Sequence, residues 1–391
     1  MESPTEWTEG MELRVLFIDD ECESVEPAAE EIKASVPTAR TKVADFDGAE
    51  ELLRDFEPHV AIIDILKSAA DGSIERVGLE ALNFVWKEHF CPLIVYSAIS
   101  KELEGELKPN PFVEFVNKGA GSEEILLACI KKFNPHITAL DEAEREIRLV
   151  MNRALRDVAP RVFAETREPQ VVNDILVRSA RRLVAAAMDD ALSSLAAGPS
   201  LRPWEHYLCP AWGKQLLTGD IIRAVSGEPT DPAAFSVVLT PSCDLAHDGR
   251  RPPKVSHVLV AGCRPVDGFL QDIKVSPRPK DKHRDMLISE LNQGYGPSHL
   301  PLPALRDQFP PMVADLRALE LIATARIGEA APLEYFRVAS VDHPFRELVS
   351  WAYMHVAARP GLPDRDCRSW AEEIFDAVSP AATEPEQDAS N

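Results

Sequence analysis

The sequence predicts an α/β chain that begins with a five-stranded, doubly wound parallel sheet, continues through a helical linker and ends in a β-rich α+β domain. Three observations predict this order. Short apolar runs alternate with amphipathic stretches over residues 11–137, the pattern that places helices on both faces of a parallel sheet. Residues 138–200 are rich in alanine and arginine, with apolar residues at helical spacing. Residues 201–378 are proline-rich and contain short β-like runs.

The elements expected in the first region follow the alternation of apolar runs and amphipathic stretches. The apolar runs predict strands near residues 13–18, 40–46, 60–64, 92–97 and 112–116. The amphipathic stretches predict helices near residues 24–35, 47–56, 78–89 and 121–133, with a short charged helix at 100–107. Prolines lie just before several of the strands and separate the elements.

The linker is expected to contain two helices, Leu140 to Val158 and Pro169 to Ala197, and Pro160 is expected to break the first or to open another. These helices either pack on their neighbours or form a dimerising pair. In the third region we expect strands near 220–225, 235–240, 257–261 and 318–327, a loop-rich segment at 274–311, and closing helices at 345–358 and 369–378. Residues 379–391 are acidic and rich in small residues, which predicts a disordered tail.

Composition limits the classes of partner and compartment. The chain has 391 residues, enough for two or three domains, and a formal net charge of −22, which disfavours binding to nucleic acid. It contains neither an apolar run of membrane-spanning length nor a signal-peptide pattern. The seven cysteines are scattered, as is typical of reduced thiols. We therefore expect a cytoplasmic protein without a membrane segment.

Chemically reactive side chains stand at the ends of four predicted strands. Asp19 and Asp20 follow the first strand, Asp64 follows the third, Ser97 ends the fourth and Lys118 follows the fifth. The carboxyl ends of parallel strands meet at one edge of the sheet, where ligands of such folds bind. We therefore expect these groups to form one site.

Residues 12–134 resemble the receiver domain of bacterial two-component response regulators. The resemblance rests on Asp19-Asp20-Glu21, Asp64, Ser97, Phe115 and Lys118, each at the expected strand end, and on the separation of 44 positions from Asp20 to Asp64. It implies that a cognate histidine kinase phosphorylates Asp64 and that Asp19, Asp20 and Asp64 hold Mg²⁺. It also implies that Ser97 and Lys118 contact the phosphoryl group and that Phe115 is the switch aromatic.

Two departures from that family leave an alternative open. Gly119 follows the lysine where the family most often has proline, and the segment from Leu66 to Val77 is longer and more polar than usual. The alternative is a pseudo-receiver, which has lost regulated phosphorylation and acts as an interaction protein.

The third region contains the run Leu239-Thr240-Pro241-Ser242-Cys243-Asp244-Leu245. It is similar to a T-x-[ST]-C-D-L signature of uncharacterised bacterial proteins, and this similarity implies no activity. Cys243 is a candidate nucleophile with Asp244 orienting a base such as His247 or His257. The same residues with Cys263 could instead bind zinc, although their spacing fits no familiar zinc motif. The third interpretation is a buried cysteine beside a turn-capping aspartate.

Two classes of function follow. The leading interpretation is a response regulator whose phosphorylated receiver switches a C-terminal output domain that binds a protein or ligand rather than DNA, with a homodimer through the linker as a further expectation. The alternative is a receiver-gated hydrolase or nuclease that uses Cys243 and Asp244. Whether the chain is an enzyme beyond phosphotransfer and autodephosphorylation is left open.

Overall fold

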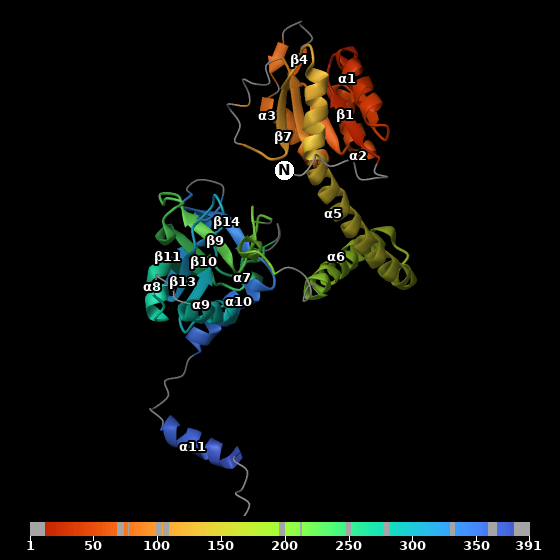
Figure 1. Ribbon diagram of the computed structural model, residues 1–391. Helices are drawn as coiled ribbons and strands as arrows, with labels where there is room; N and C mark the ends of the chain where they lie inside the picture. The colour runs from red at the N-terminus through yellow and green to blue at the C-terminus, as the bar shows by residue number, and fades with distance from the viewer. Residues whose placement is uncertain are drawn as a thin grey trace, which may run out of the picture. The chain divides into compact units, whose positions relative to one another are not determined.

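The computed structural model describes residues 12–68, 74–76, 78–98, 104, 109–194, 200–211, 213–247, 252–276, 281–328, 333–358 and 366–378. Its contacts divide the chain into two compact units, Met1–Gly198 and Pro199–Asn391 (Figure 1). No helix in these described ranges is long and apolar enough to cross a membrane.

The first unit contains the predicted five-stranded parallel sheet. Its strands are β1 (Arg14–Ile18), β2 (Arg40–Ala44), β3 (Val60–Ile63), β6 (Leu93–Ser97) and β7 (Val113–Asn117), in the order β2-β1-β3-β6-β7. All neighbouring strands of this sheet run parallel. A small antiparallel pair, β4 (Leu66–Ser68) and β5 (Ile74–Arg76), follows β3 and was not predicted.

Helices cover both faces of this sheet, as a doubly wound fold requires. One apolar core joins the sheet to α1 (Cys22–Ser35) and to the first part of α5 (Ser122–Glu165). The other joins it to α2 (Phe46–Phe56) and α3 (Gly78–Glu88). The central strands are buried on both sides, which explains their continuous apolar runs. The charged helix expected at 100–107 lies almost wholly outside the described residues.

The expectation that Pro160 interrupts the linker is wrong. Pro160 lies inside α5, which continues from the receiver-like sheet as a single helix of 44 residues, about 66 Å long. The helix ends at Glu165, and α6 (Pro169–Ser194) then packs back against it. Val162 is buried, so packing beyond Pro160 offsets the backbone hydrogen bond that proline cannot make.

The second unit is built on a seven-stranded antiparallel sheet. Its strands are β8 (Tyr207–Leu208), β9 (Asp220–Ala224), β10 (Phe235–Val238), β11 (His257–Pro265), β12 (His299–Leu302), β13 (Met312–Ala323) and β14 (Tyr335–Val341). They lie in the order β12-β13-β11-β10-β9-β14-β8. The predicted strands are present as β9, β10, β11 and β13, whereas β8, β12 and β14 were missed. β13 begins six residues before the predicted start, and Thr324–Arg326 form a 3-10 turn rather than strand.

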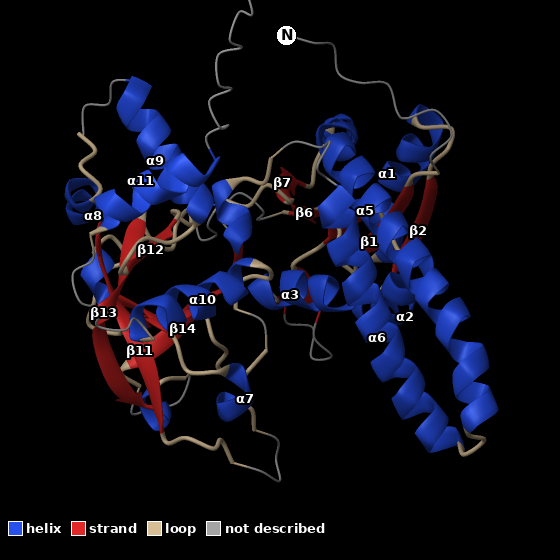
Figure 2. Ribbon diagram, turned by 90° about the horizontal axis from the view of Figure 1, so that it is seen from below, coloured by secondary structure: helices blue, strands red, loops and turns tan. Residues whose placement is uncertain are grey.

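Helices cover this sheet, as Figure 2 shows in blue against the red strands. They are α7 (Ser242–Leu245), α8 (Val266–Asp272), α9 (Asp281–Gln293) and α10 (Phe345–Ala357). The last helix, α11 (Cys367–Val378), does not cover the sheet, and its described side chains are exposed. The two closing helices were predicted. The segment 274–311, expected to be loop-rich, contains the helix α9 and the strand β12. Neither element has a strong periodic signal in the sequence, because α9 is mostly polar and β12 is a short edge strand. The expected disordered tail, 379–391, lies outside the described residues.

Candidate functional site

The register of the parallel sheet brings the predicted strand-end residues to one edge. Ile18 pairs with Ile63, so Asp19 and Asp64 leave their adjacent strands at the same level. Ser97 pairs with Asn117, so Lys118 lies one residue beyond Ser97 on the neighbouring strand. Adjacent strands are about 4.8 Å apart, which allows side chains at these ends to meet.

Lys118 bridges two buried carboxylates at this edge. Its Nζ donates to Asp19 Oδ2 and to Asp64 Oδ2, both at 2.6 Å. The other oxygen of each carboxylate accepts a backbone N–H, from Glu21 to Asp19 Oδ1 at 2.8 Å and from Leu66 to Asp64 Oδ1 at 2.9 Å. Every oxygen of the two carboxylates therefore accepts a hydrogen bond, and two of these bonds come from a cation.

Burial and charge act in opposite directions on this cluster. Burial raises the pKa of Asp19, while Lys118 and the Glu21 N–H partly offset that rise. Burial would lower the pKa of Lys118, but its hydrogen bonds and attraction to the two carboxylates outweigh burial, so the pKa is raised. Lys118 is therefore fully charged near neutral pH and holds the two acids together.

Ser97 presents a hydroxyl without a partner beside this bridge. Its side chain is fully buried, and its Oγ has no hydrogen-bond partner among the described residues. Its carbonyl accepts the Lys118 N–H at 3.1 Å. A buried hydroxyl normally finds a partner, so the orphaned Oγ indicates a position that a ligand oxygen could fill.

Two aromatic residues flank the edge. Phe115 lies on β7, half-buried, and packs against the core under α2 and α3. Tyr96 was not predicted as a site residue; its ring lies 5.7 Å from Lys118 Nζ, and its hydroxyl shares a buried 2.7 Å hydrogen bond with Ser122. The available sequence signal was an aromatic residue in an otherwise aliphatic strand, next to Ser97.

The predicted magnesium ligands are not assembled around a common point. Among the described residues, no group of three His, Cys, Asp or Glu side chains is placed to hold a metal ion. Lys118 lies between Asp19 and Asp64, and Asp20 is half-buried beside them. The donor chemistry still fits Mg²⁺, which prefers carboxylate oxygens and keeps several waters.

Among the described residues of the second unit, no hydrogen bond joins Cys243 to a histidine that could act as its base. Cys243 is exposed on α7, and within the described residues its thiol has only Asp244 Oδ1 as a partner, at 3.7 Å. Asp244 forms an ion pair with Lys254 at 2.9 Å, which lowers its pKa. His247 is exposed. The interpretation of Cys243 as a buried cysteine is therefore wrong, because α7 turns Cys243 outward while Leu245 faces the core.

Zinc binding by Cys243, His247, His257 and Cys263 is not supported. Cys263 is buried on β11, where burial raises its pKa well above the usual thiol range. His257 is exposed and contacts Ser256. No metal-holding group was found in the described part of this unit.

The signature around Cys243 works as a structural turn. Thr240 Oγ1 accepts the backbone N–H of Leu259 at 2.7 Å, and its carbonyl accepts the Thr218 hydroxyl at 2.8 Å. Ser242 Oγ accepts the Thr218 N–H at 3.0 Å and donates to Thr218 Oγ1 at 3.1 Å. Leu245 is buried in the core on this side of the sheet. The small polar residues therefore join three chain segments.

No protein-family model matches the chain, and no curated protein matches it. Solved structures that match include anti-anti-sigma factor PhyR from Bartonella quintana, with 18% identity over 35% of this chain and 52% of that chain and a TM-score of 0.26. The response regulator PhyR from Brucella abortus matches at 20% identity over 36% and 52%, with a TM-score of 0.24. The chain spans about half the length of these proteins. Identities and TM-scores this low support no statement about the fold beyond what the sheet topology itself shows.

Proposed function

We propose that this chain is a response regulator that accepts a phosphoryl group on Asp64 from a cognate histidine kinase. The observation that carries the proposal is the Lys118 bridge between Asp19 and Asp64, with the orphaned hydroxyl of Ser97 beside it. A purely structural ion pair would gain nothing from an unpaired buried hydroxyl. A phosphoryl group on Asp64 would give both Lys118 and Ser97 oxygens to contact.

The chemistry needs positioning rather than a strong base. A carboxylate oxygen of Asp64 attacks the phosphorus of a phosphohistidine, the P–N bond breaks, and its electron pair leaves with the imidazole. An acyl phosphate results, with negative charge spread over the phosphoryl oxygens. Lys118, which already contacts Asp64, would stay paired with that charge, and Ser97 would donate to one oxygen. Phe115 would move inward as Ser97 shifts.

Magnesium belongs to this proposal as an ion that Asp19, Asp20 and Asp64 would hold. When bound, it would neutralise part of the charge on the phosphoryl oxygens. Because Lys118 occupies Oδ2 of both Asp19 and Asp64, we expect the ion to compete with the lysine for these oxygens.

The test is phosphorylation of the full chain by a small acyl phosphate donor with Mg²⁺, followed by intact-mass analysis. We expect wild type to gain the mass of one phosphoryl group and Asp64→Asn to gain none. Asp55→Asn is the matched control, because Asp55 is an exposed aspartate on α2 of the same unit. Equal labelling of wild type and Asp64→Asn would contradict the assignment of Asp64. A wild type that neither the donor nor the kinase labels would support the pseudo-receiver alternative.

The output part of the proposal is a C-terminal domain that binds a protein or ligand under receiver control. The continuous helix α5 supports it: Leu126 and Phe133 of this helix lie in the receiver core, and Ala154 and Val162 lie farther along, where α6 packs. A shift at the sheet edge would therefore move a single rigid element.

We also propose that the α5–α6 hairpin pairs with a second copy of the chain. Leu149, Phe163 and Val177 are large apolar side chains on it that are 57%, 58% and 40% exposed. We expect Leu149→Glu to shift the mass measured by sedimentation equilibrium from dimer toward monomer. Ile125→Glu should leave the mass unchanged, because Ile125 is 52% exposed but lies in the first turn of α5, where the helix packs on the parallel sheet rather than on α6. A monomeric wild type would refute the pairing.

A further inference from the structure

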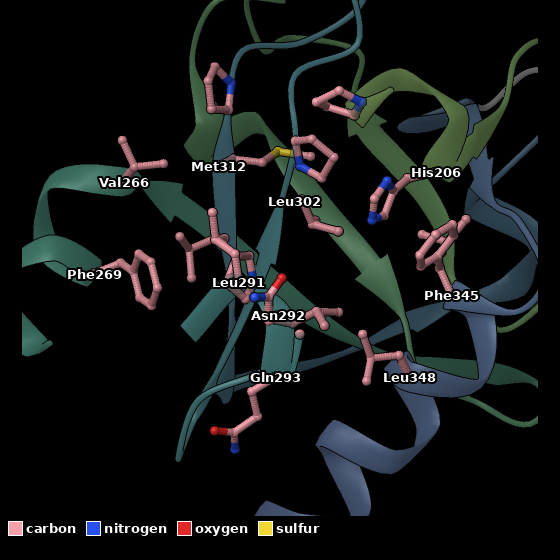
Figure 3. Close-up of a pocket in the computed structure, with 18 of the residues that line it drawn as sticks. His206, Val266, Phe269, Leu291, Asn292, Gln293, Leu302, Met312, Phe345 and Leu348 are labelled. Carbon is pink, nitrogen blue, oxygen red and sulfur yellow. The ribbon is translucent and has the colours of Figure 1, made fainter. Parts of the chain in front are cut away.

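The second unit contains a large apolar cavity that the receiver chemistry does not use. Its volume is about 590 Å³, within the range of small-molecule sites. It lies on one side of the antiparallel sheet, between β12 and β13 and the helices α8, α9 and α10. In Figure 3, Val266 and Phe269 lie on one side, and His206, Phe345 and Leu348 on the other.

The lining is almost wholly apolar. None of the described residues that line the cavity carries a formal charge, and their polar side chains are His206, Asn292 and Gln293. A charged ligand would lose its hydration without gaining a counter-ion, which is strongly unfavourable. This excludes nucleotides, sugar phosphates and carboxylates that are buried inside the cavity.

Aromatic rings form two of its walls. His206 stacks on Phe345, with centroids 3.8 Å apart and an interplanar angle of 20°. Phe269 is buried, and Figure 3 shows its ring across the cavity from this stack. Burial lowers the pKa of His206, which keeps its ring neutral. Its Nδ1 is buried without a hydrogen-bond partner among the described residues.

We propose that this cavity binds an uncharged, mainly apolar small molecule with an aromatic ring. The ring would pack against the His206–Phe345 stack or against Phe269, since aromatic pairs favour centroid separations of about 4.5–7 Å. Asn292, whose side chain points inward in Figure 3, would provide one hydrogen bond. The inference names a ligand class for the output domain and rests on the ligand-binding part of the proposed function.

Fluorescence titration of the full chain with N-phenylnaphthylamine, a neutral aromatic dye, tests the proposal. The variant is Leu291→Glu, because Leu291 lines the cavity from α9 and is 50% exposed, so the chain should still fold. The matched control is Ile288→Glu on the same helix, since Ile288 is 53% exposed and does not line the cavity.

We expect Leu291→Glu to raise the dissociation constant at least tenfold and Ile288→Glu to leave it unchanged. Equal binding by both variants, or no saturable binding by wild type, would overturn the proposal. Dye binding that appears only after Ile374→Glu, on the exposed apolar side of α11, would show that this helix fills the cavity and would also overturn it.

The titration is repeated on Asp64→Asn without any phosphoryl donor. We expect unchanged dye binding there. Dye titration therefore tests ligand binding by the cavity, and intact-mass analysis separately tests Asp64 as the phosphoacceptor, so that the failure of one proposal can be told from the failure of the other.

Discussion

Replacing Lys118 with methionine removes the cation that joins Asp19 and Asp64 but keeps most of the side-chain length. The Lys118 side chain is 24% exposed, and those of Asp19 and Asp64 are 5% and 10% exposed. Removing one partner of a buried ion pair costs about 3–5 kcal/mol, because the remaining charge is left unpaired. Each carboxylate keeps one backbone N–H, so we expect the lower end, about 3 kcal/mol.

Hydrogen exchange of the amides in β1 and β3 measures this loss, since core amides exchange through unfolding of the whole unit. A loss of about 3 kcal/mol near neutral pH corresponds to exchange roughly 150 times faster. Lys132→Met is the control, because Lys132 pairs with Glu114 while 66% exposed, and such pairs contribute about 1 kcal/mol or less. Equal exchange in the two variants would refute the reasoning that the bridge holds the sheet edge together.

Three further predictions concern other buried groups. Burial lowers the pKa of His59 from 6.5 to about 4, so the unfolded state binds the proton first and the free energy of unfolding falls as the pH drops from 6.5 toward 4. Urea unfolding should therefore show that wild type loses roughly 2 kcal/mol more stability than His59→Gln between about pH 7 and pH 5. Ser340→Ala removes a 2.6 Å donor from the fully buried Asp220, and thermal unfolding should show a loss of about 1–3 kcal/mol in the second unit. Leu245→Ala should cost about 2–5 kcal/mol, whereas Cys243→Ala should change stability by less than about 0.5 kcal/mol in the same melts.

The parallel sheet could be predicted because its signals are local. β3 and β6 are buried along their whole length, so each reads as a continuous apolar run, and the intervening helices are amphipathic. β14 was missed for an equally local reason. Arg337 interrupts its apolar residues, and only the fold shows that this arginine turns to Asp220 and to backbone carbonyls of residues 211–215. A half-buried arginine in a strand looks like a loop residue until its partners are known.

The site was predicted in its residue types but not in its contacts. The strand ends could be inferred from the parallel topology, whereas the Lys118 bridge depends on side-chain geometry across residues that are 54 and 99 positions apart in sequence. The cavity of the second unit had no sequence signal, because its walls come from α8, α9, α10 and the β12–β13 pair, and three of these elements, α8, α9 and β12, were not expected.

A buried hydrogen bond connects the strand that ends at Ser97 with the long helix. Tyr96 precedes Ser97 on β6, and its hydroxyl bonds to Ser122 at the start of α5. Phosphorylation of Asp64, as proposed, would replace a carboxylate by a group of about −1.5 to −2 charges and draw Lys118 away from Asp19. A movement of Ser97 toward that group would pull on the Tyr96–Ser122 bond. Because α5 is one helix from Ser122 to Glu165, the pull would reach the hairpin without crossing a flexible joint.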